Sequence, residues 1–365
     1  MLPGWDAIGV AALRCWEVDA RRAAEQAGSR DGYAVLGGRR AGRLVEIRPD
    51  IEALDEPGFW VVVGTFEGRW TCIRFAEVAP EPATAATGGG HEAPWTPMPA
   101  GAWRSSLEAD AYRAAVVTIR DLIAAGEVYQ VNLCRVLAAP VAPDTDLDAL
   151  AVRLARGNPA PFAARIHVPD AGLDLVCASP ELYLRRDGPD VASAPIKGTG
   201  AVPSDLSAKD VAENVMIVDL VRNDLGRVAE PGSVVVDDVL AVEPHPGLVH
   251  LVSTVRARLR PATSWADLLT ATFPPGSVSG APKSTALRAI EALEPVPRGP
   301  YCGAIGWVDS ERSRGVVAVG IRTFWREGSH LHFGTGAGIT WGSDPDREWQ
   351  ETELKAARLL RLAGA

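Results

Sequence analysis

The stretch RIHVPDAGLDLVCASPELYL, residues 165–184, contains the pattern that decides the fold class. Two short strand-like segments, residues 165–168 and 173–178, follow one another with only a turn between them. Successive strands joined by turns, with few helices between them, form mainly antiparallel sheets against which helices pack from outside. The stretch therefore predicts an α+β fold.

The same pattern extends in both directions along the chain. Segments of alternating or continuous apolar character, punctuated by Gly and Asp, predict further short strands. They cover residues 33–36, 43–47, 59–64, 128–138, 233–239, 304–308, 315–323 and 331–333. The expected strands thus run almost the whole length of the chain.

Three segments have the 3.6-residue apolar period of helices that face a core. The first covers residues 107–126 and the second residues 207–226, and both end at a glycine. The third begins with Asp344 as its N-cap and Pro345 in its first turn. The side chains that the second helix is expected to bury are Val211, Val215, Val218 and Leu225.

Residues 80–101, PEPATAATGGGHEAPWTPMPAG, interrupt the pattern, because Pro, Gly, Ala and Thr leave no apolar period to bury. We expect a linker or a long surface loop here. It divides the chain into a partial, shortened N-terminal β-rich lobe, residues 1–101, and a larger domain, residues 102–365. The chemically informative motifs all lie in the larger domain.

Composition and charge exclude several kinds of partner. The chain has a net charge of -9 and no run of Lys or Arg, so it repels phosphate backbones and nucleic acid is not an expected partner. No segment reaches 18 uninterrupted apolar residues, so no membrane span is expected. Five widely spaced cysteines without a CxxC pair are typical of a reducing compartment, and we expect a soluble, cytoplasmic protein.

The first candidate site combines SPELY, residues 179–183, with APIKGTG, residues 194–200. Glu181 and Lys197 lie sixteen residues apart on two strand-like segments that could meet in one cleft. An apolar Pro-Ile pair before Lys197 would partly desolvate its amine, which lowers a lysine pKa and frees the lone pair for attack. A lysine taken alone, however, is more often an exposed residue ahead of a turn.

The second candidate consists of two acidic pairs at i, i+3 spacing, Asp210 with Glu213 and Glu348 with Glu351. Each pair shares a helical face, and Lys355 follows Glu351 by one turn. Carboxylates gathered in this way suit Mg²⁺ completed by waters and substrate oxygens. The alternative is a solvated helix with an ordinary Glu351–Lys355 ion pair.

The third candidate is a set of small-residue turns, PPGSVSGAPKS at residues 274–284 and GTGAG at residues 334–338. The second turn fails the GxGxxG pattern and lacks a surrounding βαβ unit, so a dinucleotide site is not expected. Backbone amides in such turns can hold a carboxylate, with Arg322 as a bidentate partner. Gly-rich segments are more often only turns.

Taken in order, the motifs resemble those of the chorismate-utilising enzymes, the family of anthranilate, aminodeoxychorismate, isochorismate and salicylate synthases. The resemblance covers about residues 103–360. The matching segments are VYQVNLCR, ASPELYL, PIKGT, AENVMIVDLVRNDLGRV, VHLVSTV, FPPGSVSGAPK, YCGAIGWV, IRT, GTGAGI and SDPDREWQETELKA. It implies two large, mostly antiparallel β-sheets packed as a sandwich, with helices outside and the active cleft between the sheets.

Two positions indicate which member of the family the chain resembles. Aminodeoxychorismate synthases have a lysine where Lys197 stands in PIKGT, whereas anthranilate synthases have alanine. Isochorismate and salicylate synthases have a water-activating lysine where this chain has Gln130. The resemblance therefore implies amination of chorismate at C4, with ammonia as the nucleophile. The alternatives are an anthranilate synthase, another aminating chorismate enzyme, or a non-catalytic regulatory paralogue that binds chorismate.

The resemblance also implies a role for each site residue. Glu181 would protonate the departing C4 hydroxyl, with His250 orienting it, and Lys197 would attack C2 to form a covalent adduct. Mg²⁺ would be held mainly by Glu213 and Glu351, with Asp210 and Glu348 nearby. The implied substrate contacts are Arg322, Tyr301, Gly336, Ala337, Gly338, Ser277, Lys355 and Thr199.

Two features depart from typical family members. GAVPSDLSAKD follows PIKGT directly in place of basic residues and a longer loop, so closure over the substrate is expected to differ. The N-terminal lobe is short, and no regulatory tryptophan pocket can be located in it. The chain also has no recognisable glutaminase motif, so ammonia for p-aminobenzoate and folate synthesis is expected to come from solution or from a separate glutaminase subunit.

Overall fold

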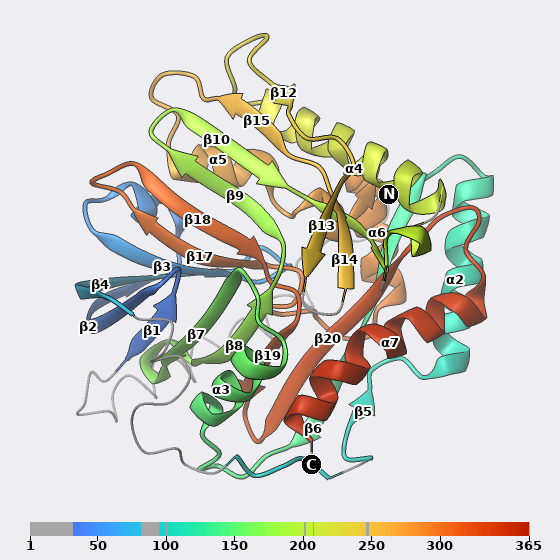
Figure 1. Cartoon of the computed structure of the whole chain (residues 1–365), viewed down its shortest axis with the longest axis horizontal. Helices are drawn as coiled ribbons and strands as arrows, with labels where there is room; N and C mark the ends of the chain where they lie inside the picture. The colour runs from blue at the N-terminus through green and yellow to red at the C-terminus, as the bar shows by residue number, and fades with distance from the viewer. Residues whose placement is uncertain are drawn as a thin grey trace, which may run out of the picture.

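The structure, a computed structural model, describes residues 32–81, 95–99, 101–200, 202–206, 208–245 and 248–364. Most of the expected linker lies outside these residues, so the linker and the division of the chain at residue 101 remain predictions. Within the described part, the strands pair antiparallel and helices lie outside them (Figure 1). The predicted α+β fold is confirmed.

Hydrogen bonding is continuous across seventeen of the described strands, and the strands divide into two halves. In hydrogen-bonded order the first half is β1 (Tyr33–Leu36), β7 (Phe162–Val168), β8 (Leu173–Ser179), β19 (Thr323–Glu327), β20 (His330–Ile339) and β6 (Gln130–Pro140), with the short β5 (Arg104–Ser105) and β16 (Gly280–Ala281) beside β6. The second half is β2 (Arg39–Arg48), β4 (Trp70–Pro80), β3 (Phe59–Gly64), β17 (Ala304–Asp309), β18 (Arg314–Val319), β9 (Leu182–Asp187), β10 (Asp190–Ala194), β15 (Val255–Arg258) and β12 (Val235–Val236).

The two halves join where β1 pairs with β2 and share one apolar core. Core side chains come from both, for example Leu175 on β8 and Val317 on β18, and both are essentially inaccessible to solvent. Two of the crossings that the chain makes between the halves run from β8 to β9 and from β18 to β19. These two crossings turn out to carry site residues.

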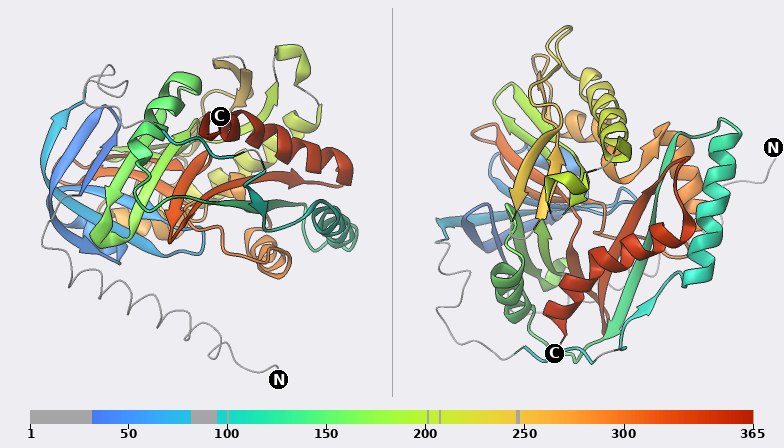
Figure 2. Two further views of the ribbon diagram at one scale, coloured as in Figure 1. Left: turned by 90° about the horizontal axis from the view of Figure 1, so that it is seen from below. Right: turned by 45° about the vertical axis from the view of Figure 1, so that its right-hand side comes forward.

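A separate three-stranded sheet stands beside the sandwich and was not expected (Figure 1). It consists of β11 (Ile196–Gly200), β14 (Leu248–Val252) and β13 (Ala241–His245), in that order. The helices are α2 (Ala109–Ala124), α3 (Leu147–Gly157), α4 (Ala208–Gly226), α5 (Trp265–Thr272), α6 (Lys283–Leu293) and α7 (Pro345–Ala363), and the short 3-10 turns are η1 (Ile51–Asp55), η3 (Pro169–Ala171), η4 (Pro203–Asp205) and η5 (Gly276–Val278). Helix α7 lies across β20, and α2 packs beside α7 (Figure 2).

The predicted start of the last helix is confirmed. The Asp344 side chain accepts a hydrogen bond from the Arg347 backbone N–H at 3.0 Å, and Pro345 occupies the first turn. On the second predicted helix, α4, Val218 and Leu225 are buried as expected. Val211 and Val215 are 39% and 47% exposed, so their predicted burial is wrong. The inner face of the first turns of α4 instead carries polar side chains, Glu213 and Asn214.

One turn prediction and two strand predictions also need correction. GTGAG, predicted as a turn, forms part of β20, because β6 pairs with it along its whole length from Gly334 to Gly338. The strand expected over residues 315–323 is split into β18 and β19, because Arg322 has a φ of 54° and breaks the extended backbone. The strand expected over residues 233–239 is reduced to Val235–Val236.

Candidate active site

Lys197 lies at an irregularity in strand β11. Ile196 is paired with Val252 and Thr199 with His250, so the register shifts across Lys197 and Gly198. Such bulges re-aim side chains and are common beside active sites. Gly198 has a φ of 85°, and a Cβ added there would lie 2.8 Å from the Cβ of Asp210. Only glycine therefore allows the first turn of α4 to pack so closely on the Lys197 strand.

Helix α4 is fixed to the same small sheet by a buried asparagine. The Asn214 amide donates to the Leu251 carbonyl at 3.2 Å and accepts from the Ser253 hydroxyl at 2.5 Å. The neighbouring residue on the helix, Glu213, is 8% exposed. The anchor therefore fixes the position of Glu213 relative to the Lys197 strand.

Glu181 occupies the crossing from β8 to β9 and is only 3% exposed. Burial raises the pKa of its carboxyl to about 7, although a Ser277 hydrogen bond and the charges of Lys197 and Arg322 oppose the rise. A carboxyl with this pKa is about half protonated at neutral pH, so it can both donate and take up a proton there. The structure thus places Lys197, Arg322 and Ser277 close enough to act on the Glu181 carboxyl.

Arg322 occupies the second crossing, from β18 to β19, next to the first. The Ala178 backbone N–H at the end of β8 donates to the Arg322 carbonyl at 3.0 Å, which fastens the two crossings together. The Arg322 guanidinium lies 3.4 Å from Nε2 of His250, a residue that is 1% exposed on β14. Burial lowers the pKa of Arg322, and the nearby Arg358 guanidinium lowers it further. Arg322 is partly buried and Arg358 is exposed, and two guanidinium groups close together favour an anionic ligand.

The side chains of Gln130, Lys197 and Glu213 converge on Gly338, near the end of β20, and we call this place the Gly338 corner. A Cβ added at Gly338 would lie 2.4 Å from Nε2 of Gln130 and 3.4 Å from both Nζ of Lys197 and Oε2 of Glu213. Gln130 is 1% exposed, and within the described part of the chain both polar atoms of its amide have no hydrogen-bond partner. An amide buried in this way has unsatisfied capacity to bind a ligand.

The predicted metal-binding carboxylates gather around the Lys355 amine. Lys355 forms an ion pair with Glu351 at 2.7 Å and donates to the Gly336 carbonyl at 3.1 Å. Burial acts to lower the pKa of Lys355, but Glu351, with Glu213 and Glu348 in support, raises it above its ordinary value. Asp210 packs against Gly198. The Glu351–Lys355 ion pair is therefore present, and Glu213 and Glu348 lie close enough to act on the same amine.

The oxygen-rich donor set suits a hard cation such as Mg²⁺. Glu213 and Glu348 are 8% and 3% exposed, and carboxylates buried to this extent need a cationic neighbour. Within the described ranges, however, no three acidic, histidine or cysteine side chains converge closely enough to hold a metal ion as they stand. To bind a metal, the carboxylates would have to move closer together, or the Lys355 amine between them would have to move away.

The remaining predicted substrate contacts lie on β20, on β11 and at Tyr301, and they differ in how accessible they are to a ligand. Tyr301 is 5% exposed, and its ring packs on the backbone of Gly334, where an added Cβ would lie 2.0 Å from its Cγ. Gly336 and Ala337 are buried in the ladder between β20 and β6. Thr199 pairs with His250 through the backbone. The glycine-rich segment therefore presents a strand and not a turn to a ligand.

Sequence reasoning missed a buried ion pair that supports the site. Arg298 is 1% exposed and donates to Glu294, to the Val278 carbonyl at 2.8 Å and to the Asn132 carbonyl at 2.7 Å. Val278 follows Ser277, and Asn132 lies two residues after Gln130, so this pair holds two site segments together. A lone arginine between prolines in PVPRGP carries no sequence pattern that would have indicated it.

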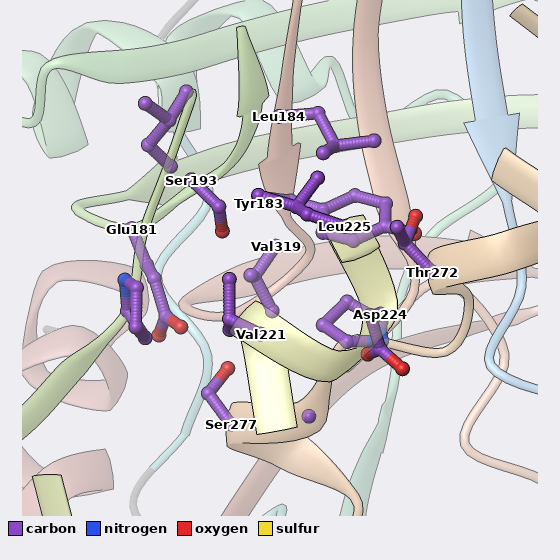
Figure 3. A pocket seen from close by; sticks show the side chains of 14 residues that line it. Glu181, Tyr183, Leu184, Ser193, Val221, Asp224, Leu225, Thr272, Ser277 and Val319 are labelled. Atoms are coloured by element: carbon purple, nitrogen blue, oxygen red, sulfur yellow. The ribbon is translucent and has the colours of Figure 1, made fainter. Parts of the chain in front are cut away.

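A small cavity lies directly behind Glu181 (Figure 3). Glu181 and Ser277 line one end and Asp224 and Thr272 the other. Asp224 is paired with Lys283 at 2.6 Å, and both residues lie in motifs quoted above without an assigned role. The sequence could not indicate this cavity, because it depends on how α4, β9 and η5 pack together.

Comparison with known proteins agrees with this geometry. A family model described as chorismate binding enzyme matches residues 90–361. The aminodeoxychorismate synthase component 1 of Klebsiella aerogenes is 40% identical over 71% of this chain and 59% of its own length. The anthranilate synthase component 1 1 of Haloarcula marismortui is also 40% identical, over 71% of this chain and 54% of its own length. The chain thus spans between half and three fifths of the length of these relatives.

Solved structures support the fold. The anthranilate synthase component I of Streptococcus pneumoniae superposes with a TM-score of 0.73 at 24% identity, covering 91% of each chain. The menaquinone-specific isochorismate synthase of Escherichia coli superposes with a TM-score of 0.75 at 19% identity, covering 94% of this chain and 91% of that one. In the part of the chain that the structure describes, no helix is long and apolar enough to cross a membrane.

Proposed function

We infer the reaction from one premise: the chain belongs to the family of chorismate binding enzymes. We propose that it replaces the C4 hydroxyl of chorismate with an amino group from ammonia and yields 4-amino-4-deoxychorismate. The observation that carries the proposal is the position of Lys197. Its amine lies near Gly338 together with Glu213 and Gln130, and it acts on the pKa of the buried Glu181 carboxyl. A candidate nucleophile and a candidate general acid thus lie close to each other.

The chemistry requires an acid, because hydroxide is a poor leaving group. The Lys197 amine forms a bond to C2, the ring double bonds shift, and the C4–O bond breaks as Glu181 donates a proton and water departs. Ammonia then forms a bond to C4, the double bonds return, and the C2–N bond breaks with its electron pair going back to Lys197. The new C4 ammonium returns a proton to Glu181. The enolpyruvyl ether stays intact, so no pyruvate is released.

Lys197 can attack only as an uncharged amine. Gln130 cannot act as a base that activates water. A carboxamide has no basic lone pair at neutral pH, but it can donate to and accept from a neutral nucleophile. The site therefore favours ammonia over water. This is the feature that supports amination over formation of isochorismate.

The substrate carries two carboxylates, and the site offers cationic groups for both. We propose that the partly buried Arg322 binds the enolpyruvyl carboxylate, with His250 orienting the C4 hydroxyl. Lys355, Tyr301 and the Gly336–Gly338 backbone are proposed to complete this part of the pocket, with Ser277 and Thr199 beside Glu181 and His250. Arg322 and Arg358 lie close enough to raise the local positive potential.

Mg²⁺ is the cofactor that the acidic cluster suits. Glu213 and Glu351 are proposed to hold it, with Asp210 and Glu348 nearby. When bound, the ion would neutralise the ring carboxylate of the substrate. Glu213 connects the nucleophile with the proposed metal site. It lies near Lys197 at the Gly338 corner and also belongs to the carboxylates around Lys355.

Ammonia is proposed to come from a separate glutaminase subunit. Relatives at about 40% identity are named as component 1 of aminodeoxychorismate synthase, a name that implies a second component. The product would then serve p-aminobenzoate and folate synthesis. An anthranilate synthase is the second candidate, because a relative with that name is equally similar.

The proposal is tested by supplying the purified chain with chorismate, Mg²⁺ and ammonium, and then adding an aminodeoxychorismate lyase. Formation of p-aminobenzoate that depends on both the chain and ammonium is the expected result. Fluorescent anthranilate as the main product would establish the second candidate instead. Chorismate binding without any turnover would identify a regulatory paralogue.

A further inference from the structure

One edge of strand β6 pairs with β20, and the other edge is completed in its middle part by side chains. At its start this second edge pairs with β16, and the Asn132 backbone N–H donates to the Ser279 carbonyl at 2.8 Å. Beyond that point the Glu294 carboxylate accepts from the Cys134 backbone N–H at 2.8 Å. The Arg298 guanidinium donates to the Asn132 carbonyl at 2.7 Å. Arg298 and Glu294 therefore satisfy backbone groups of β6 where the neighbouring strand ends.

The same guanidinium also holds the turn η5, which carries Ser277. Arg298 is 1% exposed and donates to the Val278 carbonyl at 2.8 Å. Ser277 precedes Val278, and its hydroxyl lies at the Glu181 carboxyl (Figure 3). A planar guanidinium with five donors can bridge two carbonyls and a carboxylate in a fixed geometry, which a lysine ammonium cannot do. One side chain thus fixes the hydrogen-bond partner of the candidate general acid relative to the strand that carries Gln130.

Arg298 is in turn fixed by residues 65–69, the turn between β3 and β4 in the N-terminal lobe. The Glu67 carboxylate accepts from the Arg298 backbone N–H at 2.7 Å and from the Gly299 backbone N–H at 3.4 Å. The Arg298 guanidinium lies over the Phe66 ring, 4.1 Å from the ring centroid. Residues 65–69 precede the segment that matches the family model, residues 90–361. A part of the chain outside the family pattern therefore supports the site.

The position of Arg298, and not its charge, connects it to Glu181. Glu294 neutralises the guanidinium at 2.6 Å. The charged and titratable side chains that act on the Glu181 carboxyl or line the cavity behind it are Lys197, Arg322, Tyr183 and Asp224. The Ser277 hydrogen bond acts on the same carboxyl and lowers its pKa. Ser277 is therefore the link through which Arg298 reaches the candidate general acid.

We propose that Arg298 is a positioning residue of the site: it fixes Ser277 against Glu181 and the turn η5 against the start of β6, and residues 65–69 fix Arg298. The part that these contacts play in amination rests on the proposed function. Without the guanidinium, the two carbonyls that it bridges lose their common donor, and Ser277 moves relative to Glu181. A weaker Ser277 hydrogen bond stabilises the charged carboxylate less, so Glu181 keeps its proton to a higher pH.

The test compares Arg298→Lys with Ser277→Ala and with the variant that carries both changes. Lysine keeps the buried positive charge but cannot bridge the two carbonyls. Glu67→Ala loosens Arg298 from an exposed position, and Arg69→Ala is its matched control, exposed on the same turn. For each variant the melting temperature is measured, and the titration midpoint of Glu181 is measured by ¹³C NMR of the glutamate carboxyls, assigned with Glu181→Gln.

Ser277→Ala and Arg298→Lys should each raise the Glu181 midpoint by about one pH unit, the effect of losing one hydrogen bond to a charged group. The variant with both changes should show no larger rise than Ser277→Ala, because Arg298 acts through Ser277. Glu67→Ala should give a smaller rise and Arg69→Ala none. The pH above which the amination rate falls should move upward together with the midpoint.

A purely structural role gives a different result. Arg298→Lys or Glu67→Ala would then lower the melting temperature and leave the Glu181 midpoint unchanged, and an unchanged midpoint in either of them that folds would overturn the proposal. Additive rises in the variant with both changes would exclude the route through Ser277. The NMR titration needs no turnover, so it still decides this inference if the unmodified chain forms no aminodeoxychorismate and the proposed function fails.

Discussion

Replacing Glu181 by glutamine should abolish amination while making the protein more stable at alkaline pH. The glutamine amide cannot donate a proton to the departing C4 oxygen, and loss of a general acid typically costs about 10²–10⁴ in rate. The same substitution removes a carboxyl that is 3% exposed and must ionise inside the protein as the pH rises. Activity and stability should therefore change in opposite directions.

The size of the stability change follows from the raised pKa. In the folded protein the pKa of Glu181 is about 7, against an ordinary 4.5, so the folded state keeps this proton to a higher pH than the unfolded state. Folding stability therefore falls as the pH rises from about 4.5 to about 7. At about 1.36 kcal/mol for each pH unit, the full effect is about 3 kcal/mol, of which about 2.5 kcal/mol appears between pH 5 and pH 8.

Urea unfolding at pH 5 and at pH 8 measures this difference. The gain in unfolding free energy of Glu181→Gln over the unmodified chain should be larger at pH 8 than at pH 5 by about 2.5 kcal/mol. Glu311→Gln, at an exposed position, controls for the chemical change itself. A stability difference that is the same at both pH values would refute the assignment of a buried, protonated acid.

Three further substitutions test other parts of the site. Lys197→Ala should keep chorismate affinity within about tenfold, measured by titration, while amination falls by about 10² or more through loss of the nucleophile. Normal turnover in this variant would remove that role. Glu351→Gln should raise the Mg²⁺ concentration needed for half-maximal activity without changing the helical circular dichroism signal, and unfolding instead would mean that Glu351 is structural. Gly338→Ala should displace the Gln130 amide, 2.4 Å from the new methyl, and destabilise the protein by about 1–3 kcal/mol in thermal unfolding. Unchanged activity and stability would contradict the close packing of that corner.

The sequence was informative where local chemistry determines structure. Asp344 and Pro345 specify the start of α7 by capping alone, and the cap forms as expected. Glu181 and Lys197 could be placed together because two strands joined by a short connection return to the same edge. The family pattern then assigned roles that spacing alone left open.

The sequence was uninformative where distant segments decide the outcome. GTGAG has the composition of a turn, yet pairing with β6 holds it as a strand. The bulge at Lys197 depends on β14, and the Asp210 contact that requires Gly198 depends on α4. The convergence of Gln130 and Glu213 on Gly338 likewise involves three elements, and no local pattern contains it.

The most direct test of the account is the amount of pyruvate released for each chorismate consumed. The purified chain is incubated with chorismate, Mg²⁺ and ¹⁵N-labelled ammonium, and pyruvate and labelled products are measured in the same sample. The account predicts ¹⁵N-labelled 4-amino-4-deoxychorismate and no pyruvate. One pyruvate for each chorismate, with the label in anthranilate, would contradict it.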